Sequence, residues 1–170
     1  MGDAICGRVG HRLSEFLSNL EGGVILGSTE AAVSTLEIIK AASYECGSEF
    51  KDFLLRGIPS VVASRPSSQV LENVLRMYVE RFLTIASKNG LRSAVEETPV
   101  IIDSLIRDLE DVREAVAEVG SRRIEDEDTI LTHSYSSTVI KTFEKAVARG
   151  VRFKVYTTES RPTGEGRVMA

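Results

Sequence analysis

The sequence predicts an α+β protein in which a helical N-terminal domain precedes a strand–helix–strand unit. Apolar residues recur at helical spacing over most of residues 1–124. Two short apolar runs, Thr129–Leu131 and Val151–Thr157, then flank a helix-forming run, Thr138–Arg149. This order is typical of two parallel strands joined by a crossover helix. We therefore divide the chain into a helical domain, residues 1–124, and an incomplete α/β segment, residues 125–170.

Five helices are expected in the helical domain, and their ends follow from capping residues and helix breakers. Glycine favours a helix end, serine and threonine favour a helix start, and proline is tolerated in the first turn. These signals place a first helix that ends at Gly22–Gly23, a second capped by Ser28 or Thr29, a third broken at Gly57–Pro59, a fourth that starts at Ser64–Pro66, and a fifth that starts at Thr98–Pro99.

The fifth helix is the longest and carries an apolar seam with alternating spacings of three and four residues: Ile102, Leu105, Leu109, Val112, Val116 and Val119. Such a seam is typical of helices that pack along their length. We expect it to lie lengthwise on the preceding helices, and a dimeric coiled coil is the alternative. The acidic turn Glu125–Asp128 that follows is expected to be solvated, with cation binding as its alternative.

Composition narrows the classes of function. The 170 residues carry a net charge of −4, which does not favour direct nucleic-acid binding. No apolar run is long enough to cross a membrane, and no signal peptide is visible at the N-terminus. The two cysteines, Cys6 and Cys46, lack metal-site spacing, so we expect free thiols in a reducing cytosol, with a disulfide as the alternative. The sequence predicts a cytoplasmic protein without a metal site or cofactor.

Polar side chains follow each predicted strand. Ser136, Ser137 and Thr138 stand where the helix begins, and a helix N-terminus can hold an anion. Arg161 follows the second strand, and Arg65, like Arg161, precedes a proline. Ligand crevices open at the carboxyl ends of parallel strands, and arginine suits bidentate phosphate contacts. The alternatives are ordinary caps for the serines and surface or domain-interface ion pairs for the arginines.

Residues Thr129–Ala170 resemble the alpha/beta/delta subunit family of translation initiation factor 2B. That family pairs an ILTH-x-YS strand-loop with a TESRP-x-x-x-G-x-x-MA strand-loop, and this chain has ILTHSYS and TESRPTGEGRVMA. Upstream, Ala63–Ser67 resembles a Ser/Thr-Arg-Pro loop of the related sugar-phosphate isomerases. The resemblance implies a Rossmann-like domain with further strands, of which this chain would hold the first strand–helix–strand unit. We expect a truncated product, or a protein that completes its sheet with another chain.

The related isomerases act on methylthioribose 1-phosphate and ribose 1,5-bisphosphate. The resemblance implies that they carry a catalytic cysteine directly after Thr132–His133, where this chain has Ser134. It also implies an arginine where this chain has Leu26, and a catalytic aspartate beyond Ala170. A thiolate, with a pKa of about 8.5 for the free thiol, acts near neutral pH, whereas a serine hydroxyl needs an adjacent base. Consecutive strand residues point to opposite faces, so we expect no His133–Ser134 dyad.

These observations favour a regulatory subunit-like protein, alpha-like, that acts in translation initiation by protein–protein contact. We expect as partners initiation factor 2, other factor 2B-type subunits in a homo- or hetero-oligomer, and a phosphorylated nucleotide or sugar. The alternatives are a sugar-phosphate isomerase of the ribose-1,5-bisphosphate type and a helical module without a ligand. No catalytic residue is predicted, and the candidate ligand residues are Gly27, Ser28, Arg65, His133, Ser134, Ser136, Ser137, Glu159 and Arg161.

Three of the predicted roles stay open at this point. His133 is either a ligand contact or a hydrogen-bonded core histidine. Glu159 either bonds a ribose hydroxyl or pairs with Arg161. Tyr135 and the Phe143 side of the last helix are candidates for an interface.

Overall fold

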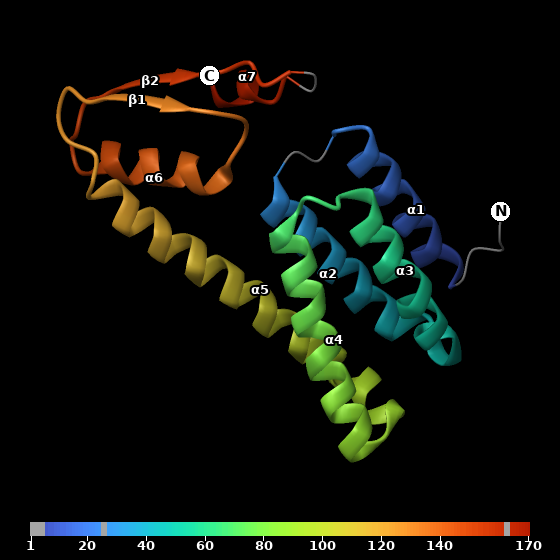
Figure 1. Ribbon diagram of the computed structural model, residues 1–170. Coiled ribbons are helices and arrows are strands. Elements are labelled where there is room, and N and C mark those ends of the chain that lie inside the picture. The colour runs from blue at the N-terminus through green and yellow to red at the C-terminus, as the bar shows by residue number, and fades with distance from the viewer. Residues whose placement is uncertain (1–5, 25–26, 162–163) are drawn as a thin grey trace. The chain divides into compact units, whose positions relative to one another are not determined.

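The computed structural model describes residues 6–24, 27–161 and 164–170. Five α-helices precede a strand, a helix and a second strand, which confirms the predicted α+β class (Figure 1). Two compact units are present, residues 1–107 and residues 108–170, and α5 runs through the boundary. The predicted division into domains after residue 124 stays a prediction. The elements are α1 (Gly7–Glu21), α2 (Ser28–Glu45), the 3-10 helix η1 (Gly47–Glu49), α3 (Phe50–Ser64), α4 (Gln69–Asn89), α5 (Leu91–Ser121), β1 (Thr129–Thr132), α6 (Ser137–Ala148), β2 (Lys154–Thr157) and α7 (Gly166–Met169).

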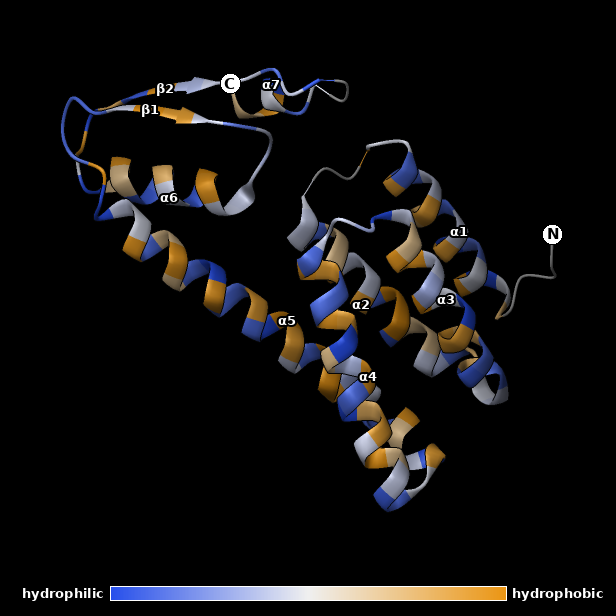
Figure 2. Ribbon diagram, viewed as in Figure 1, coloured by the Kyte–Doolittle hydropathy of each residue, from blue (hydrophilic) through white to orange (hydrophobic). Residues whose placement is uncertain are grey.

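Helix α2 lies at the centre of the first unit and contacts α1, α3 and α4. Polar and apolar residues interleave along the outer helices (Figure 2), as expected for helices that bury one stripe. Helix α2 instead buries residues around much of its circumference: Ala31, Ala32, Thr35, Leu36, Ile38, Ile39 and Ala42. The buried hydroxyl of Thr35 donates to the Ala31 carbonyl at 2.8 Å, which satisfies it inside the core.

A buried hydrogen-bonded pair joins α4 to α5. The Thr98 hydroxyl donates to the Ala94 carbonyl at 2.9 Å, so its oxygen is left to accept from the Tyr78 hydroxyl at 3.1 Å. Neither side chain is exposed to solvent. Burial raises the pKa of the Tyr78 phenol well above its ordinary value, and the bond to Thr98 opposes this only in part.

Several predicted helix ends were wrong. Helix α2 is capped by Gly27 without a side-chain hydrogen bond, rather than by Ser28 or Thr29. Helix α3 continues through Pro59 to Ser64, and α5 begins at Leu91 with Pro99 inside it. An interior proline removes one backbone hydrogen bond. The buried residues on both sides of each proline outweigh this local signal, and for α5 they include Ala94, Thr98, Ile101 and Ile102.

The apolar seam of α5 divides into two parts. Ile102 and Leu105 are buried in the first unit, as lengthwise packing predicts. Val112, Val116 and Val119, in the second unit, are 63%, 52% and 62% exposed, so this half of the seam is not buried within its own unit. The face of α5 that is buried in the second unit carries the small residues Ala117 and Ser121 instead.

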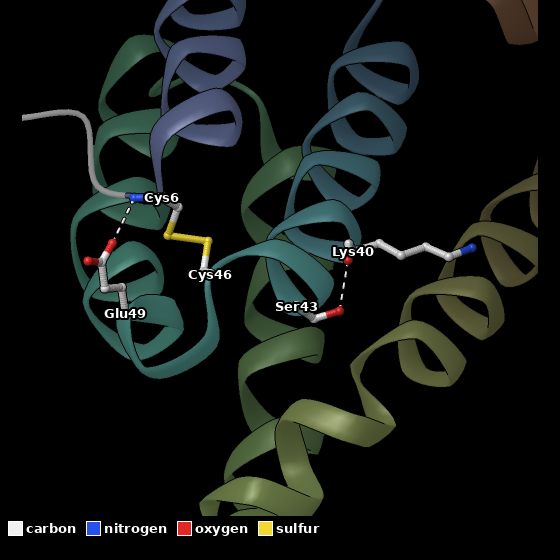
Figure 3. Close-up of a disulfide and its surroundings, with 5 residues drawn as sticks. All are labelled: Cys6, Lys40, Ser43, Cys46 and Glu49. Carbon is white, nitrogen blue, oxygen red and sulfur yellow. Dashed lines mark hydrogen bonds between the residues drawn. A yellow bond between two sulfur atoms is a disulfide. The ribbon is translucent and has the colours of Figure 1, made fainter.

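The expectation of free thiols was also wrong, because Cys6 and Cys46 form a disulfide with a Cα–Cα distance of 4.8 Å (Figure 3). Cys6 precedes α1 and Cys46 ends α2. The packing of α1 on α2 brings these two ends together across 40 residues of sequence. Sequence spacing carries no signal for such a contact, because it depends on how the two helices pack.

The second unit is built on a parallel sheet of β1 and β2, with Thr129 opposite Lys154 and Thr132 opposite Thr157. Helix α6 covers one face of this sheet (Figure 1). The ring of Phe143 on α6 packs at 5.5 Å from that of Phe153, so the predicted interface residue Phe143 serves the packing of its own unit. This arrangement confirms the predicted strand–helix–strand order.

A ladder of ion pairs joins α6 to the C-terminal half of α5. Lys141 pairs with Glu110 at 2.7 Å and with Glu114 at 2.5 Å, and Lys145 pairs with Glu114 and with Glu118. Hydrogen bonds from Lys141 and Lys145 lower the pKa of Glu114 to about 2. The acidic turn after α5 is used locally, since Asp128 accepts the Glu125 N–H at 2.8 Å.

Over the described ranges, no helix combines the length and apolar composition needed to cross a membrane.

We predict that Tyr78→Phe lowers the free energy of unfolding by about 1 kcal/mol at neutral pH, because one buried hydrogen bond is lost. The folded wild-type protein keeps Tyr78 neutral, whereas the unfolded chain ionises it above about pH 10. The contribution of Tyr78 to stability is therefore present below pH 10 and falls as the pH rises further. The variant should lose less stability between pH 9 and pH 11. Chemical denaturation at each pH measures this.

The control is Tyr156→Phe, at a side chain that is 61% exposed. This variant should follow the wild-type protein at every pH. Parallel stability curves for wild type and Tyr78→Phe above pH 10 would show that Tyr78 ionises freely in the folded state.

Candidate functional site

The carboxyl ends of β1 and β2 bring together two polar loops. Because the strands are parallel and Thr132 lies opposite Thr157, the residues that follow each strand meet at one edge of the sheet. The Thr158 N–H donates to the Thr132 carbonyl at 3.2 Å and continues the ladder past the last strand residue. His133 and Ser134 therefore face the residues after Thr157.

His133 is held by two hydroxyl groups of the opposite loop. Its Nδ1 lies 2.6 Å from the Thr158 hydroxyl and 3.4 Å from the Ser160 hydroxyl. The two hydroxyls are themselves 3.0 Å apart. The imidazole is exposed, so His133 is hydrogen-bonded as expected but is not a core residue.

Ser134 bonds to residues of the opposite loop and not to His133. Its N–H donates to the Ser160 hydroxyl at 2.8 Å, and its own hydroxyl donates to the Glu165 Oε1 at 2.8 Å. The hydrogen-bond partner of the Ser134 hydroxyl is a carboxylate, which the sequence did not predict. The second carboxylate oxygen, Oε2, is buried without a hydrogen-bond partner among the described residues.

Two serines in this network adopt left-handed backbone conformations. Ser134 has φ 63° and Ser160 has φ 60°. Such a conformation costs a non-glycine residue about 1–2 kcal/mol, and strain of this kind concentrates at functional sites. The bond from the Ser134 N–H to the Ser160 hydroxyl joins the two strained positions. The loop geometry thus turns the Ser134 hydroxyl toward Glu165.

The start of α6 lies just beyond this network. Ser136 is the N-cap, and its hydroxyl accepts the Val139 N–H at 3.4 Å, so this serine acts as a helix cap. Ser137 is the first residue of the helix. The N–H groups of a first helical turn lack acceptors within the helix, which gives this end the capacity to hold an anion. Anion binding by Ser136 and Ser137 stays a prediction.

Glu159 is shared by two arginines. Its carboxylate accepts from Arg161 at 2.7 Å and also pairs with Arg167. This pairing is one of the two roles expected for Glu159. Arg161 is 84% exposed at its side chain, so the pair lies in solvent and the guanidinium stays accessible.

The remaining candidate residues belong to the first unit. Gly27 caps α2, Ser28 is the first residue of α2, and Arg65 ends α3 with a half-buried side chain. Leu26, which stands at the isomerases' arginine position, lies outside the described residues. The structure thus bonds His133 and Ser134 to the loop that also carries the Glu159–Arg161 pair, while Gly27, Ser28 and Arg65 stay candidates on the resemblance alone.

Sequence reasoning missed Thr158, Glu165 and Arg167. No spacing pattern identified them, because Glu165 reaches Ser134 across 31 residues of sequence. Gly166, in contrast, could be recognised from the sequence, because it is the glycine of the TESRP-x-x-x-G pattern. A Cβ atom at Gly166 would overlap the Thr158 carbonyl group, so only glycine fits this close approach of two backbones.

We predict that Gly166→Ala displaces the loop after β2 and lowers the free energy of unfolding by roughly 1–3 kcal/mol. Because the clash is with backbone, no side-chain rotation relieves it. Hydrogen exchange at the Thr158 amide, which bonds to Thr132, should become faster. Gly150→Ala is the matched control, since Gly150 has φ 83° but open space around it, and it should leave this amide protected. Unchanged exchange at Thr158 in Gly166→Ala would contradict the close approach.

Comparison with known proteins identifies relatives over nearly the whole chain. A protein of Pyrococcus furiosus named ribose 1,5-bisphosphate isomerase is 28% identical over 167 residues, which cover 93% of this chain and 49% of that protein. A protein of Pyrococcus horikoshii named as an eIF-2B subunit 2-like translation initiation factor is 30% identical over 161 residues, which cover 94% of this chain and 54% of that protein. The chain thus spans about half the length of these curated relatives.

Solved structures also match nearly the whole of this chain and about half of their own length. The crystal structure of the Pyrococcus horikoshii translation initiation factor eIF-2B superposes with a TM-score of 0.77 at 28% identity, over 93% of this chain and 54% of that one. The eIF2B-beta2-delta2 complex of C. thermophilum gives a TM-score of 0.71 over 95% of this chain and 56% of that one, and at 15% identity it supports the fold alone.

The sequence profile named "Initiation factor 2 subunit family" matches residues 24–170. This span includes both polar loops and most of the helical unit. The fold, the relatives and the profile agree, and the chain belongs to the initiation factor 2 subunit family.

Proposed function

We propose that this chain is part of a regulatory subunit-like protein of translation initiation factor 2B, of alpha type. In this role it acts in the cytoplasm by contact with initiation factor 2 and with other factor 2B-type subunits. It also holds a phosphorylated nucleotide or sugar at the carboxyl ends of β1 and β2. Ser134 is the observation that carries the proposal.

The chemistry of Ser134 argues for binding over turnover. The resemblance places the isomerases' catalytic cysteine at this position, where a thiolate is accessible near neutral pH. A serine hydroxyl does not ionise in this range. It donates a hydrogen bond to the Glu165 carboxylate, which orients the hydroxyl. The pair is therefore suited to hydrogen bonding with a ligand.

Arg161 supplies the charge for a phosphate contact. Its partner Glu159 also pairs with Arg167, so two cations share one carboxylate. An exposed ion pair contributes only about 0–1 kcal/mol, so Arg161 can leave Glu159 at little cost. A bidentate bond to phosphate is stronger than such a pair. The first turn of α6 offers backbone N–H groups to the same anion.

The isomerase is the second candidate, because some of the relatives carry that name. The ribose 1,5-bisphosphate isomerase of Pyrococcus furiosus matches 93% of this chain. Isomerase activity in this protein would require a group other than the missing thiol to move the proton, and Glu165 beside Ser134 is the carboxylate in reach.

The proposed protein contacts have support in the first unit. An apolar groove of about 400 Å³ lies between α3 and α4 and is lined by Leu55, Ile58 and Leu83 among others. Leu55 and Leu83 are exposed, and exposed apolar surface of this kind marks interaction sites. The C. thermophilum neighbour is itself a tetrameric complex of beta and delta subunits.

We predict that AMP or ribose 1,5-bisphosphate raises the melting temperature of the full-length protein without turnover in the same samples. Arg161→Ala should weaken this binding roughly 10- to 100-fold, because a charge-assisted hydrogen bond contributes about 1.5–3 kcal/mol. Arg152→Ala is the matched control, since Arg152 is an exposed arginine paired with Asp126 and should not affect binding. Turnover of ribose 1,5-bisphosphate would move the assignment to the isomerase. Absence of any stabilisation would remove the ligand from the proposal.

We also predict that the full-length protein binds purified initiation factor 2, measured by sedimentation over a range of salt concentrations. Leu83→Glu should abolish this binding if the groove is the contact, whereas Thr84→Glu, at an exposed neighbouring position outside the groove lining, should retain it. No binding at any salt concentration would contradict the regulatory role, and equal binding by both variants would place the contact elsewhere.

A further inference from the structure

The first turn of α1 is intrinsically weak. It contains Gly7 and Gly10, and glycine in a helix costs about 1 kcal/mol relative to alanine. The residue before it, Cys6, makes no side-chain cap hydrogen bond. Within this turn, the Val9 N–H donates to the Cys6 carbonyl at 3.1 Å and the Val9 side chain is buried. The turn is therefore held by Cys6 and by the packing of Val9.

Two further contacts of Cys6 hold this turn. The disulfide to Cys46 ties the start of α1 to the end of α2, and the Cys6 N–H donates to the Glu49 carboxylate at 2.9 Å (Figure 3). Glu49 is the last residue of η1, the 3-10 helix that follows Cys46. The Glu49 N–H donates to the Cys46 carbonyl at 2.9 Å. Both contacts thus anchor α1 to the same corner of the first unit.

The rest of α1 has its own anchors. Phe16 and Leu20 are buried, and Leu13 packs close to Gly57 of α3. These contacts do not involve the disulfide. Loss of the disulfide is therefore expected to release the first turn while the C-terminal part of α1 stays packed.

We infer that Cys6 and Cys46 form a reversible thiol–disulfide site for small thiols such as glutathione, with Cys6 as the sulfur that is attacked. Cys46 is only 7% exposed, and Cys6 is more accessible. The redox state of this site sets how firmly the first turn of α1 is held. This inference is independent of the ligand site in the second unit.

The exchange follows two balanced steps. A glutathione thiolate attacks the Cys6 sulfur, a new disulfide joins glutathione to Cys6, and Cys46 leaves as a thiolate that takes up a proton. A second glutathione thiolate then releases Cys6 as a thiol and forms oxidised glutathione. Oxidised glutathione drives the same steps in reverse. Disulfides of cytosolic proteins are usually transient and redox-sensing, which fits the proposed cytoplasmic role.

The test compares the full-length protein in reduced and in oxidised glutathione, with the disulfide followed by thiol alkylation and mass spectrometry. Trypsin should cut after Arg8 or Arg12 at least roughly tenfold faster in the reduced state, because the first turn opens more often. Cutting after Arg152, in the second unit, is the internal control and should not change. The double variant Cys6→Ser/Cys46→Ser should be cut at the fast rate in both buffers.

The single variants test the point of attack. In Cys46→Ser, the remaining Cys6 should form a mixed disulfide with glutathione roughly tenfold faster than Cys46 does in Cys6→Ser, because access limits the exchange. Equal rates would overturn the assignment of Cys6. Thiols that stay free in oxidised glutathione, or equal tryptic cutting of wild-type α1 in the two buffers, would overturn the redox site itself.

Discussion

The in-register parallel pairing of β1 with β2 is the constraint on which the candidate site depends. It brings the loop after Thr132 beside the loop after Thr157. A slip by one residue would reverse the face of every side chain in one strand. Ser134 would then lose Ser160, and the hydroxyl would no longer reach Glu165. Helix α6 and its ion pairs to α5 stabilise the crossover that holds this register.

The site illustrates how one framework can carry two functions. The resemblance implies that the isomerases carry a cysteine in the same strand-loop where this chain has Ser134. The chemistry depends on the ionisation of that one side chain, since a thiol is within reach of physiological pH and a hydroxyl is not. Similarity to subunits and to isomerases alike therefore gives the family, and under the proposed function the residue at the strand end separates the two.

The centre and the edge of the helical unit are held by different interactions. Helix α2 buries residues around much of its surface and depends on packing. Helix α1 has buried residues in its first turn and in its C-terminal part, and the first turn is also held by Cys6. Packing energy is spread over many contacts, whereas a covalent bond acts at one point and can be switched by chemistry. A disulfide at the edge can thus change one turn without unfolding the centre.

Local patterns in the sequence were sufficient for the order of the helices and strands, for the parallel crossover and for the family. Helical periodicity and turn residues act over a few positions, so they can be read without a structure. The ends of α3 and α5, the exposed half of the α5 seam and the Cys6–Cys46 bond were decided by the tertiary structure. The Ser134–Glu165 bond was likewise decided by the tertiary structure. Each of these depends on burial or on contact between residues far apart in the chain, where packing outweighs the local preference.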